Sequence, residues 1–187
     1  PEDAANSTSH LAPATEQGSR PSYGDGGQLI AHMARDWSAM GAAARRRAHR
    51  PVLRAVRRLG REARVLVPGA GVCRLAWEIA RAGYRVEAND AAVPMLVAAR
   101  TLMAWSGPQL HVYPQLRCNM GALRRSACHS ASRLPDTSPA DARVRHLTLQ
   151  AGDFLKTYSA PEQRAAWDAV VTCYFIDPLA DPAAAIR

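Results

Sequence analysis

The 187-residue sequence has no run of about 18 apolar residues, and it does not open with a charged and apolar leader. The sequence therefore predicts neither a membrane span nor a secretory signal. We expect a cytoplasmic protein, with a nuclear location left open. Its apolar content of 48% is enough to pack the core of one ordinary domain.

Cysteine is scarce as well. The four cysteines are too few and too widely spaced for a disulfide framework, and none forms a CxxC pair, so reduced thiols are expected. A zinc site can be drawn from Cys118, Cys128, His129 and His146, but their spacing matches no known ligand pattern. The sequence therefore predicts no metal site.

Positive charge, in contrast, is in excess, with a formal net charge of +8. Much of it lies between Arg45 and Arg64. Most of the arginines there fall on the outer side of a helix whose apolar positions include Val52 and Val56. This pattern favours a solvated helix face. A nucleic-acid partner is not favoured, because the whole chain is rich in arginine and alanine, which indicates a coding bias.

Three regions follow one another along the chain. Residues 1–27 are rich in Ser, Thr, Pro, Gly and Ala and predict a disordered tail. Residues 28–62 predict a helical region, with helices over 28–41 and 42–59, the second divided by Pro51.

Residues 63–187 predict part of a Rossmann-like α/β domain, because strand and helix patterns alternate. Apart from residues 106–142, which show no clear period, the expected elements are strands over 64–67, 84–88, 144–150 and 169–176 and helices over 74–82 and 95–105. The strand over 169–176 is apolar on both faces, which is typical of a central parallel strand.

The first strand ends in a glycine turn, which points to a bound cofactor. Gly69 and Gly71 leave backbone N–H groups open to a ligand at the start of a helix. Asp90 ends the next strand, where a carboxylate can bind ribose hydroxyls; the less favoured alternative is an Asn89-Asp90 turn that caps the following helix. A dinucleotide fingerprint needs a third glycine where Arg74 stands. S-Adenosylmethionine, which has no pyrophosphate, is therefore favoured over a nicotinamide cofactor.

Later strand ends supply three further candidates. Asp153 can accept a hydrogen bond from an adenine amino group, and Phe154 can cover the ring. Asp177 follows the apolar strand, where it can orient a substrate amine or imidazole, or else cap a helix at Pro178. Cys173 is interpreted as a core residue whose backbone borders the cofactor.

These residues resemble the carnosine N-methyltransferase family. The resemblance rests first on Val67-Pro68-Gly69-Ala70-Gly71 and the helix Arg74-Leu75-Ala76-Trp77-Glu78-Ile79-Ala80, which is more specific than the glycines. Further matches are Arg35-Asp36-Trp37-Ser38, Tyr113-Pro114, Arg124-Arg125-Ser126-Ala127, Leu134-Pro135-Asp136, Ala151-Gly152-Asp153-Phe154, Tyr158-Ser159 and Trp167-Asp168 through Asp177.

The resemblance implies an S-adenosylmethionine-dependent enzyme that methylates an imidazole nitrogen of carnosine or a related histidine-containing dipeptide, giving anserine from carnosine. It assigns cofactor contacts to Arg35, Gly69, Asp90, Asp153, Phe154 and Cys173. The sequence departs from the family at His32, Cys73 and Asp90, where the family has Gln, Gly and Glu. The family's sheet continues past Arg187, so the resemblance also predicts that C-terminal strands are missing here. A homodimer is left open.

Three rival interpretations remain at this point. The first is a methyltransferase that acts on protein histidine or RNA and docks through the arginine-rich helix. The second is a nicotinamide-dependent oxidoreductase, which Arg74 disfavours. The third is a fragment without catalytic activity, whose last strand would expose an unpaired edge.

Overall fold

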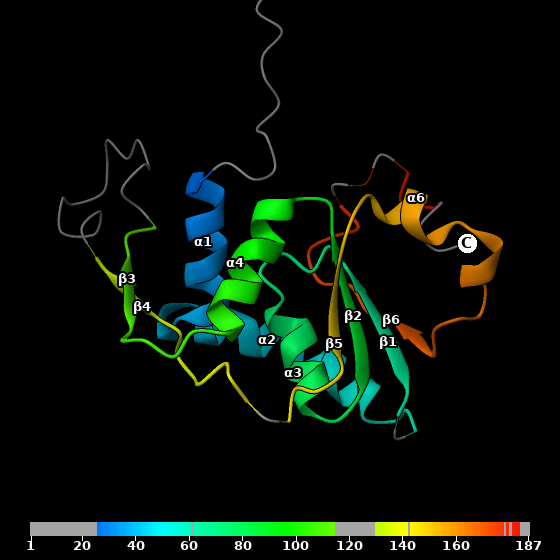
Figure 1. Ribbon diagram of the computed structural model, residues 1–187, viewed down its shortest axis with the longest axis horizontal. Coiled ribbons are helices and arrows are strands. Elements are labelled where there is room, and N and C mark those ends of the chain that lie inside the picture. The colour runs from blue at the N-terminus through cyan, green and yellow to red at the C-terminus, as the bar shows by residue number, and fades with distance from the viewer. Residues whose placement is uncertain are drawn as a thin grey trace, which may run out of the picture.

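The computed structural model describes residues 26–60, 62–114, 130–141, 143–177, 179 and 181–183. Figure 1 shows a central sheet flanked by helices. Within these ranges, no helix is both long enough and apolar enough to span a membrane. The helices are α1 (Gly26–Trp37), α2 (Ala42–Val56), α3 (Arg74–Arg81), α4 (Val93–Met103) and α6 (Phe154–Tyr158), with 3-10 turns η1 (Ala39–Gly41) and η2 (Pro161–Gln163). The strands are β1 (Arg64–Pro68), β2 (Arg85–Asp90), β3 (Leu110–Val112), β4 (Ser132–Leu134), β5 (Leu147–Ala151) and β6 (Ala169–Val170).

Four parallel strands form the main sheet, in the order β5-β2-β1-β6. Val65 of β1 lies opposite Val86 of β2 and Ala169 of β6. Ala88 of β2 lies opposite Leu149 of β5. Parallel neighbours need crossover connections, and α3 supplies the one between β1 and β2. This arrangement confirms the predicted α/β, Rossmann-like sheet with a helical N-terminal extension.

The main core lies between this sheet and helices α2, α3 and α4. Alternate residues of a strand face the same side, and Val65 and Val67 of β1 share one buried cluster with Val86 and Ala88 of β2. Ile79 of α3, which is fully buried, joins the same cluster. Burial of one such side chain contributes about 1.5–3 kcal/mol. The cluster therefore fixes α3, and the turn that precedes it, against the sheet.

Helix α2 runs without interruption, so the predicted division at Pro51 is wrong. Pro51 has no N–H to donate to the carbonyl of Arg47, so a single helical hydrogen bond is lost. The apolar face of the helix compensates for that loss, because Val56 belongs to the main core and Val52 packs against it.

The last strand departs further from its prediction. The sequence predicts a central apolar strand over 169–176, whereas β6 comprises two residues at the edge of the sheet. Val170 is 53% exposed. The Val171 N–H still donates to the Leu66 carbonyl at 2.8 Å, but the chain then leaves the sheet, with Tyr174 at a φ of 58°. Within the described part of the chain β6 pairs only with β1, so it lies at the edge of this sheet.

A short antiparallel pair lies within residues 106–142, for which the sequence predicts no regular structure. Strands β3 and β4 pair through Leu110 opposite Leu134 and Val112 opposite Ser132. Leu134 is fully buried beside Trp37 in a second core cluster. Strands of three residues are too short for their periodicity to be recognised in a sequence.

Two tryptophans and one arginine join the N-terminal helices to α3. Trp37, at the end of α1, meets Trp77 of α3 edge-to-face, with 5.6 Å between ring centroids. The guanidinium of Arg74 lies over both rings, at 4.9 and 5.2 Å. The Trp37 indole N–H donates to the Val72 carbonyl at 2.8 Å, and the Trp77 indole N–H to the Pro139 carbonyl at 3.0 Å. Both buried rings therefore have their polar atoms satisfied.

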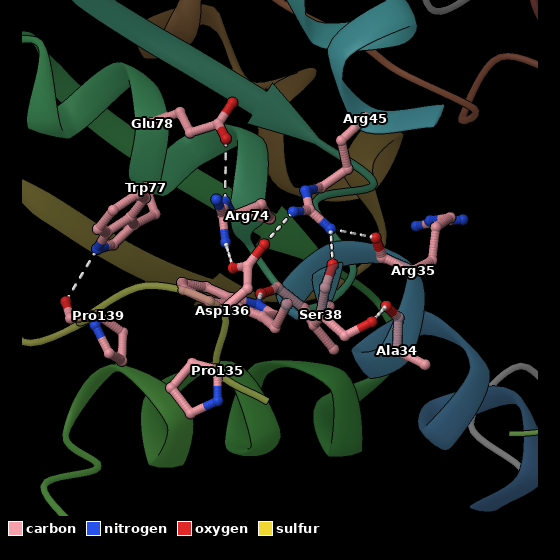
Figure 2. A network of polar contacts seen from close by, with 12 residues as sticks. Ala34, Arg35, Ser38, Arg45, Arg74, Trp77, Glu78, Pro135, Asp136 and Pro139 are labelled. Atoms are coloured by element: carbon pink, nitrogen blue, oxygen red, sulfur yellow. Dashed lines mark hydrogen bonds and ion pairs between the residues drawn. The ribbon is translucent and has the colours of Figure 1, made fainter. Parts of the chain in front are cut away.

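Asp136 supplies a carboxylate to this junction between the N-terminal helices and α3, and Figure 2 shows its contacts with Arg74 and Arg45. One carboxylate oxygen accepts from Nη1 of Arg74 at 2.7 Å, and the other accepts from Nη2 of Arg45 on α2. Arg45 also donates to the carbonyls of Arg35 and Ser38, each at 2.7 Å. Arg45 is only 6% exposed, so it departs from the predicted solvated face. A charge buried to this extent needs a counterion.

Glu78 extends the ionic network along α3. Its Oε1 accepts from Nε of Arg74 at 3.0 Å, and its Oε2 lies 3.0 Å from Nδ1 of His49 on α2. Burial opposes ionisation of Glu78, but these two partners outweigh it and lower the pKa of its carboxyl group. Glu78 is therefore ionised at neutral pH and helps to join α2 to α3.

We expect Asp136→Asn to lower the free energy of unfolding by about 3–5 kcal/mol, because Arg45 then stays buried without a counterion and Arg74 keeps only Glu78. Urea denaturation followed by tryptophan fluorescence measures the change. Glu62→Gln is the matched control. It removes a carboxylate from a pair with Arg85 whose side chains are 66% and 57% exposed, and we expect less than about 1 kcal/mol. Equal losses in both variants would contradict the role of Asp136.

Candidate functional site

The turn between β1 and α3 has a backbone that its glycines permit. Gly69 and Gly71 adopt φ angles of 62° and 54°, in the left-handed region that side chains disfavour. The Ala70 N–H donates to the Asn89 carbonyl at 2.9 Å, and the Cys73 N–H donates to the Ala70 carbonyl at 2.8 Å. The turn is therefore fixed against the end of β2.

Asp90 lies beside this turn and accepts two backbone hydrogen bonds. Its Oδ2 accepts from the Gly71 N–H at 2.7 Å, and its Oδ1 accepts from the Ala92 N–H at 2.8 Å, just before α4. The bond from Ala92 shapes the turn before α4, whereas the N-cap residue of that helix is Ala92 itself, with no side-chain cap hydrogen bond. These bonds of Asp90 do not exclude a ribose contact, since an ionised carboxylate has about four acceptor positions.

Asn89 links the glycine turn to the turn after β5, although it is not among the predicted site residues. Its side chain is 1% exposed, and Nδ2 donates to the Gln150 carbonyl at 3.1 Å and to the Gly152 carbonyl at 3.0 Å. Its own carbonyl holds Ala70, as described above. A polar residue at the end of a buried strand is the signal in the sequence that points to it.

Asp153 and Phe154 follow Gly152 at the same end of the sheet, where the carboxyl ends of the strands lie. The Gly152 N–H donates to the backbone carbonyl of Asp90 at 3.1 Å, which brings this turn to the end of β2. Asp153 caps α6 by accepting from the Lys156 N–H at 3.0 Å, and its side chain is otherwise exposed. The structure therefore brings Gly71, Asp90, Asp153 and Phe154 to neighbouring strand ends.

Arg35 approaches from α1 and makes a bidentate ion pair with Asp36, at 2.7 and 2.8 Å. Its guanidinium also lies 5.5 Å from the Tyr174 ring centroid and 3.4 Å from Nδ1 of His32. Burial, and then the charge of Arg35, lower the pKa of His32. His32 is therefore neutral at pH 7, and it lies close to the space where Gly71 would carry a side chain.

The two described thiols are not poised for nucleophilic chemistry. Burial raises the pKa of both Cys73 and Cys173, so both are protonated at neutral pH. Cys173 packs at the margin of the main core, in keeping with its predicted interpretation as a core residue.

Arg35, Gly69 and Cys173 line one small cavity of about 30 Å³. That volume is roughly the space of one water molecule. The Phe175 ring covers Gly69 so closely that a Cβ there would lie 2.0 Å from ring atom Cδ2. Phe175 also meets the Phe154 ring edge-to-face at 5.8 Å. Asp90 and Asp153 have the acceptors to hold an adenosine group, and any group that lies directly on Gly69 must displace the Phe175 ring.

Asp177 is exposed in a turn, and among the described residues no hydrogen bond or ion pair involves its side chain. The structure thus does not join it to the other predicted site residues.

Within the described ranges, no group of three or more His, Cys, Asp and Glu side chains could hold a metal ion. Cys118, Cys128 and His129, and the matched residues 124–127, lie outside these ranges.

Comparison with known proteins gives one consistent result. A family model described as carnosine N-methyltransferase matches residues 22–181. The chain is 32% identical over 155 residues to carnosine N-methyltransferase unmet of Drosophila melanogaster, covering 78% of this chain and 33% of that protein.

Two further relatives named carnosine N-methyltransferase agree. The protein of Schizosaccharomyces pombe is 30% identical over 159 residues, covering 79% of this chain and 43% of that protein. The protein of Mus musculus is 32% identical over 154 residues, covering 76% and 38%. The chain thus spans about a third to two fifths of the length of these curated relatives.

We expect Asn89→Ala to lower the free energy of unfolding by about 1–3 kcal/mol, because two backbone carbonyls at the end of β5 lose their buried donor. Chemical denaturation measures the loss. The control is Gln150→Ala on the neighbouring strand. Its exposed side chain bonds only the adjacent carbonyl, that of Ala151, and we expect a change within about 0.5 kcal/mol. If both variants unfold like the wild type, Asn89 does not hold the two turns together.

Proposed function

The chain belongs to the carnosine N-methyltransferase family, and from that premise we propose that it is the S-adenosylmethionine-binding part of an N-methyltransferase. The methyl acceptor in this proposal is an imidazole nitrogen of carnosine or a related histidine-containing dipeptide, and the product from carnosine is anserine. The proposal is supported by the family match and by the glycine turn, Asp90 and the Asp153 turn, which Asn89 joins at one edge of the sheet.

The residues of the crevice divide the binding task among them. The glycine turn lets a ligand approach its backbone with no Cβ of its own in the way, once the Phe175 ring has moved off Gly69. Asp90 accepts hydrogen bonds from the ribose, Asp153 accepts from the adenine amino group, and Phe154 covers the ring. Arg35 lies at the other end of the crevice, where its guanidinium is paired with Asp36 and has further N–H donors for a carboxylate.

Transfer itself needs orientation more than acid–base chemistry. When bound, S-adenosylmethionine supplies an electrophilic methyl group on its sulfonium. The chain's own residues hold a neutral imidazole nitrogen in line with that methyl and exclude water. The new N–C bond would replace the S–C bond of the sulfonium and leave the ring as an imidazolium, so the proton on the other ring nitrogen would become acidic. Asp177 is our candidate for the carboxylate that holds this N–H, because it comes two residues after Phe175, whose ring covers Gly69.

We expect Asp90→Ala to weaken binding of S-adenosylhomocysteine, the demethylated product, by at least about ten-fold, measured by calorimetry. A ribose contact of a charged group is worth about 1.5–3 kcal/mol, which corresponds to such a factor. The control is Asp168→Ala. Asp168 also accepts a backbone N–H, that of Arg64 at 2.7 Å, but at the opposite end of the sheet. Unchanged binding in Asp90→Ala would remove Asp90 from the proposed site.

Asp177→Asn tests the acceptor side separately. We expect methyl transfer to carnosine to fall by about ten-fold or more, in the range of general acid–base contributions. S-Adenosylhomocysteine should bind as tightly as to the wild type, because the cofactor contacts stay intact. Unchanged turnover in Asp177→Asn would mean that another group positions the imidazole.

A further inference from the structure

A basic groove of about 740 Å³ lies between α2, α3 and the residues Asp136, Thr137 and Arg143. Eight arginines and two carboxylates line it, so positive charge dominates its walls. The arginines are Arg45, Arg46, Arg50, Arg54, Arg57, Arg74, Arg81 and Arg143. The groove is separate from the small cavity beside Gly69, although Arg74 and His49 border both.

The charge in this groove is unevenly compensated. Arg45 and Arg74, at its floor, are paired with the two carboxylates, Asp136 and Glu78. Arg81 and Arg143 share Asp141. The arginines of the α2 wall differ, because they are exposed and make no ion pair with any described residue. They are Arg46, Arg50, Arg54 and Arg57.

The spacing of these arginines is regular along the helix. Arg46, Arg50 and Arg54 follow one another at steps of four residues, and a step of four residues rises by about 6 Å along a helix. Like charges at this spacing repel and destabilise a helix. A row of this kind gains stability when a polyanion neutralises several of its charges at once.

The structure thus changes what the sequence alone favours, which is a solvated helix face. The arginine row of α2 lines a groove rather than an open helix face. Arg81 and Arg143 carry the same charge on the other side of this groove. Tyr84, which is half-buried, adds an aromatic ring to the lining. Arginine side chains bind phosphates in a bidentate manner, and aromatic rings stack with bases.

We propose that this groove binds a single-stranded nucleic acid, with Arg46, Arg50 and Arg54 on phosphates of the backbone and Tyr84 against a base. An acidic polypeptide could use the same charges, but it would have no use for the aromatic ring. The proposal does not depend on the methyltransferase function proposed above.

The test measures fluorescence anisotropy of a labelled oligouridylate of about 20 nucleotides, titrated with the chain at several salt concentrations. The groove variant combines Arg46→Gln, Arg50→Gln and Arg54→Gln. The control variant combines Arg47→Gln, Arg58→Gln and Arg133→Gln, which removes the same charge from exposed positions that do not line the groove.

We expect the groove variant to bind at least about ten-fold more weakly at 0.1 M salt. Its log–log salt slope should fall by about 2, since three contacts to a single strand contribute roughly 0.7 each. The control should lose less than about three-fold. Thermal unfolding checks the fold, and the melting temperature of the groove variant should stay equal or rise, because repulsion along α2 is relieved.

Three results would overturn the proposal. The first is no saturable binding of the oligouridylate by the wild type, even at 50 mM salt. The second is an equal loss in the two triple variants, which would assign the binding to net charge rather than to the groove. The third is polyglutamate of similar length binding as tightly as the oligouridylate and displacing it, which would assign the groove to an acidic polypeptide.

Discussion

The ionic junction of Asp136 with Arg45 and Arg74 is the contact on which the placement of the N-terminal helices depends. Buried guanidinium groups must find a counterion, and one carboxylate serves two of them, from α2 and from α3. Because Arg45 also binds the Arg35 carbonyl, the same junction fixes the end of α1. Arg35 therefore reaches the glycine turn from α1, and the position of α1 depends on the distant ion pair of Arg45 with Asp136.

The ends of the central strands form a second unit, organised by two neighbouring residues. Asn89 ties the glycine turn to the turn after β5, and Asp90 holds the Gly71 N–H and the entrance of α4. These bonds fix backbone rather than side chains, so they preserve the shape of a cradle whether or not a ligand is bound. Phe175, which covers Gly69, is in contrast a side chain on a segment that has left the sheet.

Arg74 connects the two surfaces to which we assign function. The sequence marks it as the residue that stands in place of a third glycine, and so as a reason to disfavour a dinucleotide. In the structure its side chain lies over Trp37 and Trp77, pairs with Asp136 and Glu78, and borders both the crevice and the basic groove. A glycine at this position could not hold the N-terminal helices.

The sequence by itself determined the βαβ unit, the glycine turn, the helices α1, α3 and α4, and the family, because each depends on local periodicity or on a motif within a few residues. The tertiary structure alone decided that Arg45 is buried, that Asn89 joins two turns, that β6 is short, and that Phe175 covers Gly69. Each of these depends on a partner tens of residues away, and local pattern carries no information about which distant charge, carbonyl or strand a residue will meet.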